Sequence, residues 1–141
     1  MSKKIKFIVS ACLAGEKCRY DCQSKPNQKI MDLVTSGEAI SLCPEQLGGL
    51  STPRPAAEVQ KDGKVLTIDG VDLSLPYQQG AKEAWKMAQS HPIRRAYLKS
   101  KSPMCGSSKI YDGSFSGKLT NGKGAFATLL AKHGITIKSI E

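Results

Sequence analysis

Long apolar runs are missing from this 141-residue chain, and no stretch approaches the length that crosses a bilayer. At the start, in MSKKIKFIVSACLAGEKCRYDC, charges follow directly after a short apolar run, and no small-residue cleavage signal is present. These absences exclude a membrane-spanning helix and disfavour a secretory leader. We therefore expect a cytoplasmic protein without a membrane partner.

Aromatic residues are scarce, with three Phe, four Tyr and one Trp. The chain has no platform of aromatic and basic residues on which single-stranded bases could stack. Its net charge of +9 is spread along the sequence rather than gathered in one block. This charge is compatible with an anionic partner such as a nucleotide, or with solubility alone. Nucleic acid is a possible partner that the sequence does not favour, and no feature indicates an oligomeric state.

Cysteine is present in an odd number, and no CxxC pair occurs. A chain of this length can bury a core without cross-links, so we expect a single domain over residues 1–141. In a reducing cytoplasm a disulfide framework is disfavoured, and metal binding or catalysis becomes the better hypothesis. The five cysteines are Cys12, Cys18, Cys22, Cys43 and Cys105.

Hydrophobic periodicity predicts alternating strands and helices. Short apolar runs predict strands over 6–9, 39–43, 93–98 and 135–140. Apolar spacing predicts a helix with Pro26 in its first turn that ends at Gly37, a second over 79–90, and a third around Phe126 that ends at Gly134. A turn at 61–64 predicts a β-hairpin flap. The pattern favours an α/β protein with a small, Rossmann-like, mainly parallel open sheet flanked by helices.

Three isolated cysteines follow predicted strands, and they are Cys12, Cys43 and Cys105. Ligands of open parallel sheets bind beyond the carboxyl ends of the strands, so these thiols are expected to meet. Three thiolates suit zinc or an iron-sulfur cluster, and they would leave one metal position open. The alternative is three buried cysteines without a ligand, since free cysteine is often buried.

Two other apparent motifs fail on inspection. Cys18 and Cys22 resemble the start of a CxxxCxxC pattern, but Lys25 stands at its last position. The segment GSFSGKL imitates a phosphate-binding loop, yet it is one residue short and has Leu119 in place of Ser or Thr. We therefore expect a plain loop there and leave Cys18 and Cys22 without a role.

Four blocks of the sequence resemble, in order and spacing, those of the thiouracil desulfidase (TudS) family, formerly a bacterial domain of unknown function. The blocks are VSACLAGEKCRYD, CPEQLGGLSTPRPAAEV, LKSKSPMCG and IYDGSFSGKLTNGKG. This resemblance implies a 4Fe-4S cluster on three cysteines, with the fourth iron free to bind the sulfur of a thiolated pyrimidine. The substrate would be 2- or 4-thiouracil or a thiouridine nucleotide. That iron would polarise the thiocarbonyl as a Lewis acid while water attacks, so uracil and hydrogen sulfide would form without redox chemistry.

The family's functional residues fall on definite positions of this chain. The resemblance implies that Cys12, Cys43 and Cys105 are the cluster ligands, the same cysteines that follow the predicted strands. It also singles out Glu45, which could activate water or move protons to the ring, and Ser102, which could orient the base. The simpler alternatives are a capping or surface carboxylate for Glu45 and a turn residue for Ser102.

The chain departs from the family pattern at a few positions. Cys22 stands where glycine is expected, Ala14 where leucine is usual, Ser51 where proline is usual, and Met104 where serine is frequent. None of these changes removes an implied ligand, although Cys22 adds a thiol near Cys12.

Other hypotheses follow from the same residues. Arg19, Arg54 and Lys101 could bind the phosphate of a nucleotide, or could be solvated surface charges. The protein could instead be a metal or iron-sulfur sensor without activity, an RNA-binding module, or a sulfur carrier that uses Cys105 as a metal-free nucleophile.

Overall fold

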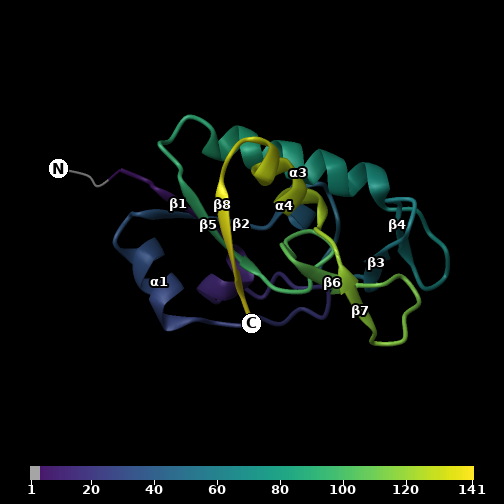
Figure 1. Ribbon diagram of the computed structural model, residues 1–141. Coiled ribbons are helices and arrows are strands. Elements are labelled where there is room, and N and C mark those ends of the chain that lie inside the picture. The colour runs from purple at the N-terminus through teal and green to yellow at the C-terminus, as the bar shows by residue number, and fades with distance from the viewer. Residues whose placement is uncertain (1–3) are drawn as a thin grey trace.

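A four-stranded parallel sheet forms the centre of the molecule in the computed structural model, which describes residues 4–141 (Figure 1). Its strand order is β2-β1-β5-β8. The strands are β1 (Phe7–Ser10), β2 (Ala39–Leu42), β5 (Arg95–Lys99) and β8 (Thr136–Ile140). All three neighbouring pairs are parallel, so the carboxyl ends of the strands lie along one edge of the sheet.

Helices cover both faces of this sheet. On one face α1 (Gln28–Thr35) buries Ile30 against Val9 and Tyr97. On the other face α3 (Ser74–Ala88) and α4 (Ala125–Lys132) pack over Ile8 and Leu98 (Figure 1). Because side chains alternate along a strand, adjacent residues such as Ile8 and Val9 enter opposite layers of the core.

Two antiparallel hairpins stand outside the central sheet. The first pairs β3 (Ala57–Val59) with β4 (Val65–Thr67), and the second pairs β6 (Lys109–Tyr111) with β7 (Leu119–Asn121). Residues of both hairpins line the same pocket as residues that follow β1, β2 and β5. Two short helices, η1 (Ala11–Ala14) and α2 (Pro44–Leu47), follow β1 and β2 directly.

The predicted α/β class, with its parallel sheet, flanking helices and β-hairpin flap, is confirmed. The second hairpin was not expected, because its strands are three residues each and all of β7 is exposed, so no alternating pattern marks them. The GSFSGKL segment forms most of the loop of this hairpin, and its last residue, Leu119, begins β7.

Two predicted helix starts were wrong. Pro26 lies ahead of α1, because the side chain of Asn27 accepts a hydrogen bond from the Ile30 amide at 3.2 Å and caps the helix there. The other helix, α3, begins at Ser74 rather than residue 79, because Pro76 is tolerated in its first turn.

Among residues 4–141, no helix has both the length and the apolar character needed to cross a membrane.

Candidate functional site

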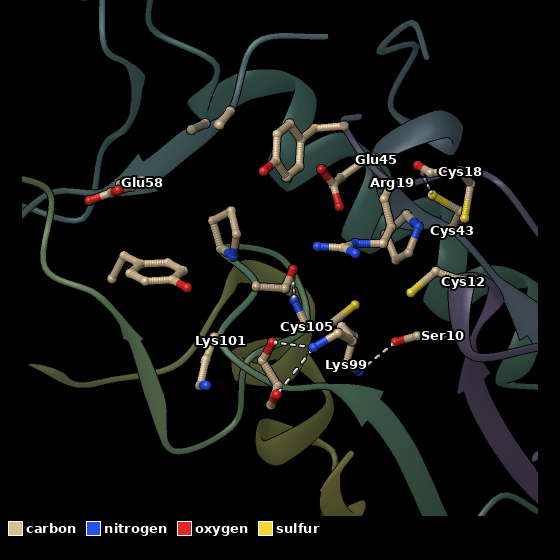
Figure 2. Close-up of a pocket in the computed structure, with 18 of the residues that line it drawn as sticks. Ser10, Cys12, Cys18, Arg19, Cys43, Glu45, Glu58, Lys99, Lys101 and Cys105 are labelled. Carbon is tan, nitrogen blue, oxygen red and sulfur yellow. Dashed lines mark hydrogen bonds between the residues drawn. The ribbon is translucent and has the colours of Figure 1, made fainter. Parts of the chain in front are cut away.

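Three cysteines from three different strand ends line one pocket of about 930 Å³ (Figure 2). Cys12 lies in η1 just after β1, and Cys43 follows β2 directly. Cys105 is on the loop after β5. The structure therefore brings together the three residues that the sequence singled out, at the edge where ligands of parallel sheets bind.

Cys18 is a fourth cysteine in the lining of this pocket, and it comes from the segment between η1 and α1. It is buried, with 4% of its surface exposed. Its carbonyl oxygen accepts a hydrogen bond from the Cys43 thiol at 3.8 Å. Cys22, on the same segment, is exposed. The sequence analysis did not distinguish the buried Cys18 from the exposed Cys22, because it left both without a role.

The loop that carries Cys105 is held from both sides. The Ser102 hydroxyl oxygen accepts hydrogen bonds from the amides of Met104 and Cys105, both at 3.0 Å. On the far side, the amide of Phe126 in the first turn of α4 donates to the Met104 carbonyl at 2.8 Å. Ser10 also lies beside this loop: its hydroxyl oxygen accepts a hydrogen bond from the Lys99 amide at 3.0 Å, and its side chain partly offsets the rise that burial causes in the pKa of Cys105. Its place at the end of β1 was a signal that could have identified it.

Glu45 enters the pocket from the first turn of α2. Its Oε2 accepts hydrogen bonds from Arg54 Nη2 at 2.9 Å and from the Tyr77 hydroxyl at 3.2 Å. Tyr77 lies in α3 and is buried. Sequence reasoning did not connect Tyr77 or Arg54 with the carboxylate, because no local spacing relates them.

Arg54 has no free donor for a phosphate. Its guanidinium makes two hydrogen bonds to Glu45 and one each to the Ser51 carbonyl, the Thr52 hydroxyl and the Cys18 carbonyl. These bonds use all the N–H groups that an arginine side chain has. The expectation that Arg54 is either a phosphate ligand or a solvated surface charge was wrong, because the side chain is buried in this network.

Burial and the contact between Cys18 and Cys43 shift the pKa values of the thiols. Burial raises the pKa of Cys12 to about 11 and that of Cys105 well above its usual value. The contact between Cys18 and Cys43 lowers the pKa of Cys43 and raises that of Cys18 itself. Without a cation among them, the Cys12 and Cys105 thiols stay protonated near neutral pH. A bound metal would supply the charge that deprotonates them.

The donor set suits an iron-sulfur cluster better than a single ion. Among residues 4–141, no three His, Cys, Asp or Glu side chains are grouped closely enough to hold one metal ion. In a cluster, by contrast, each thiolate binds a different iron, so its ligands stand farther apart than those of a single ion. Thiols from several strand ends, spread around one large pocket, fit this second arrangement.

Positive side chains line the pocket, and one carboxylate connects the two hairpins beside it. Arg19, Lys99 and Lys101 line the pocket (Figure 2). At its outer side Glu58 of β3 accepts hydrogen bonds from the amides of Gly113 and Phe115, at 3.0 and 3.1 Å. This carboxylate therefore joins the first hairpin to the loop of the second.

The fold and the pocket define a small α/β protein with four of its five cysteines gathered at the carboxyl ends of a parallel sheet. The sequence model described as 2-thiouracil desulfurase matches residues 7–141, and the chain belongs to this family. The resemblance to the thiouracil desulfidase family is thereby confirmed.

Two individual proteins are similar over nearly the whole chain. A solved structure of the 4Fe-4S-dependent thiouracil desulfidase TudS superimposes with a TM-score of 0.90 and 44% identity, over 96% of this chain and 91% of that one. The uncharacterized protein YbbK of Bacillus subtilis (strain 168) is 38% identical over 142 residues, 94% of each chain.

Proposed function

We propose that this protein is a thiouracil desulfidase whose single domain, residues 1–141, holds a 4Fe-4S cluster on Cys12, Cys43 and Cys105. The observation that carries the proposal is that these three thiols and the Glu45 carboxylate line one pocket. The name of the similar TudS structure, at 44% identity, supports it. The reaction would replace the sulfur of a thiolated pyrimidine by the oxygen of water and release hydrogen sulfide, with no net transfer of electrons.

When bound on three thiolates, such a cluster supplies an iron without a protein ligand, which is a soft Lewis acid toward a thiocarbonyl sulfur. The protein's part is to place the pyrimidine and to move protons. Both tasks fall to side chains already held in fixed positions.

Glu45 is the proposed proton-transfer group. Its Oε2 already accepts hydrogen bonds from Arg54 and Tyr77, so we assign Oε1 as the atom that takes up and returns the transferred proton. A carboxylate held in this way can take a proton from the attacking water and return it to the ring or the leaving sulfur. Because Arg54 and Tyr77 come from separate segments, the carboxylate is fixed without help from substrate.

Ser102 is the proposed anchor for the base. Its oxygen already accepts hydrogen bonds from two backbone amides, so its hydroxyl hydrogen is what it can offer to substrate. We therefore assign Ser102 as a donor to a pyrimidine oxygen or nitrogen. Arg19 and Lys101, which line the same pocket, favour an anionic substrate such as a thiouridine nucleotide over the free base.

A metal-free role for Cys105 as nucleophile is disfavoured. Burial raises the pKa of its thiol well above the usual value, whereas a nucleophilic cysteine needs its thiolate.

The test is oxygen-free purification followed by measurement of iron, acid-labile sulfide and sulfide release from 2-thiouracil, 4-thiouracil and 4-thiouridine monophosphate. We expect about four iron and four sulfide per chain, lost in Cys12→Ser, Cys43→Ser and Cys105→Ser. The exposed Cys22→Ser is the matched control and should keep both the cluster and turnover.

Glu45→Gln separates the cluster from the chemistry. The amide keeps the shape of the side chain but cannot take a proton, so we expect a full cluster and turnover reduced at least about a hundredfold. Normal turnover in this variant would remove Glu45 from the mechanism. Zinc, or no metal, in the wild-type protein would refute the proposed function.

A further inference from the structure

Cys18 is buried in the pocket, yet the proposed reaction gives it no task. It lies beside Cys43, one of the proposed cluster ligands (Figure 2). The Cys43 thiol donates a hydrogen bond to the Cys18 carbonyl oxygen at 3.8 Å, and the neighbouring Cys18 side chain lowers the pKa of Cys43. Residues that are distant in the sequence are thus in contact.

The segment that carries Cys18 is fastened in this position. Arg54 Nη2 donates to the Cys18 carbonyl at 3.0 Å, and the Tyr20 carbonyl accepts the Arg54 amide at 2.8 Å. Farther along, the Lys25 amide donates to the Cys12 carbonyl at 3.0 Å. The folded chain therefore holds Cys18 beside Cys43 through hydrogen bonds to the backbone on both sides of Cys18.

We propose that Cys18 and Cys43 form a disulfide in the cluster-free protein, with a low-molecular-weight disulfide such as oxidised glutathione as the oxidant. The Cys43 thiolate attacks one sulfur of the oxidant and releases one thiol. The Cys18 sulfur then loses its proton, attacks the Cys43 sulfur of the mixed disulfide and releases the second thiol. Two S–H bonds of the protein are exchanged for one S–S bond, and the oxidant takes up both electrons and both protons.

The disulfide has a consequence for the cluster that rests on the proposed function. Cys43 cannot bind iron while it is bonded to Cys18, so the oxidised protein cannot accept a cluster until a thiol reduces it. Cys18 would thereby couple cluster insertion to the thiol-disulfide state of the surroundings. It would also shield the Cys43 sulfur from irreversible oxidation.

The experiment begins with cluster-free, reduced wild-type protein, treated with oxidised glutathione and then with an alkylating agent. Trypsin cuts after Lys17 and Arg19, so Cys18 is released on a peptide that holds neither Cys22 nor Cys43. Mass spectrometry should find the Cys18 peptide linked to the Cys43 peptide, and the link should disappear after treatment with dithiothreitol. Linkage of Cys43 to another cysteine, or a stable glutathione adduct on Cys43, would overturn the proposal.

Cluster uptake gives the second readout. Oxidised wild-type protein should fail to take up iron and sulfide until dithiothreitol is added. Cys18→Ala cannot form the disulfide. Once a catalytic glutaredoxin has removed any glutathione adduct, this variant should take up iron and sulfide without dithiothreitol. Cys22→Ala is the matched control, since Cys22 lies on the same segment but is exposed, and it should behave as wild type. Uptake by oxidised wild type equal to that of reduced protein would refute the coupling.

The two proposals can fail separately. The peptide map needs neither iron nor substrate, so a Cys18–Cys43 link in a protein that never binds a cluster would refute the proposed function alone. A protein that loads a cluster and releases sulfide but forms no such link would refute this inference alone. If Cys18→Ala fails to fold, as judged by circular dichroism, the wild-type peptide map decides.

Discussion

The carboxylate of Glu45 is held by a buried cation and a buried hydroxyl. The Arg54 side chain is only 4% exposed, and a buried arginine is costly unless every donor is paired. Its five hydrogen bonds meet that condition. The Glu45–Arg54 pair thus follows from the requirement that buried charges be compensated, and it also fixes the group that we assign to proton transfer.

Tyr77 adds one separable hydrogen bond to this arrangement. In Tyr77→Phe the ring still fills its buried site, and Arg54 still holds the carboxylate. The variant loses one hydrogen bond to a charged group, which is worth about 1.4 kcal/mol. If the barrier rises by this amount, kcat falls about tenfold, and we expect KM to stay unchanged. Steady-state kinetics on the cluster-loaded variant measure this.

The control is Tyr97→Phe, since Tyr97 packs in the other core layer, against α1. It should leave kcat unchanged. If Tyr77→Phe also has wild-type kcat, Tyr77 does not position Glu45, and its hydroxyl serves stability alone.

At the scale of elements, the contact between α2 and α3 places Glu45 beside Tyr77. Glycines on each side allow the two helices to touch through their backbones. A Cβ added at Gly80 would lie 1.9 Å from the Pro44 carbonyl oxygen, and one added at Gly48 would lie 2.1 Å from that of Pro76. No larger residue fits at either position while the helices keep this spacing.

Gly80→Ala tests this contact, because two effects of opposite sign compete. Within a helix, alanine is favoured over glycine by about 1 kcal/mol. The backbone clash should outweigh this, so we expect a net loss of about 2 kcal/mol and a Tm lower by about 6 °C. Thermal unfolding measures the shift.

Gln79→Ala is the matched control, since Gln79 is the exposed neighbour of Gly80 in the same helix. Its Tm should change little. A Gly80→Ala protein more stable than wild type would show that helix preference dominates and that α2 can move away without cost.

At the scale of the whole molecule, the pocket joins parts of the chain that the core does not. The two core clusters are packed on opposite faces of the sheet, and Cys12 belongs to one while Cys105 belongs to the other. A cluster bound to both residues would link these layers. Ligand binding to the folded state alone also stabilises it by mass action.

Cluster loading is therefore expected to raise the Tm. A stabilisation of about 3 kcal/mol corresponds to roughly 10 °C in a chain of this size. Calorimetry under anaerobic conditions, before and after removal of iron by a chelator, measures the difference. Cys12→Ser should show no difference between the two treatments, and an equal Tm for loaded and stripped wild type would contradict the expectation.

The sequence by itself determined the type and order of the central elements. Local patterns were sufficient to predict strand and helix. These patterns are the short apolar run of β1 and the helical spacing of Ile30 and Leu33 in α1, and each extends over only a few residues. The same local signals placed Cys12 and Cys43 directly after strands. The parallel order then implied that these cysteines share an edge.

Only the tertiary structure decided which side chains meet at that edge. Three contacts join segments that are far apart in the chain. They are those of Glu45 with Tyr77, of Cys18 with Cys43, and of the Glu58 carboxylate with the Phe115 amide. No local periodicity encodes such pairs, because they depend on how helices and hairpins pack against one another. Arg54 shows the physical reason most directly: its sequence surroundings are those of a surface loop, and burial among five acceptor contacts makes it part of the site.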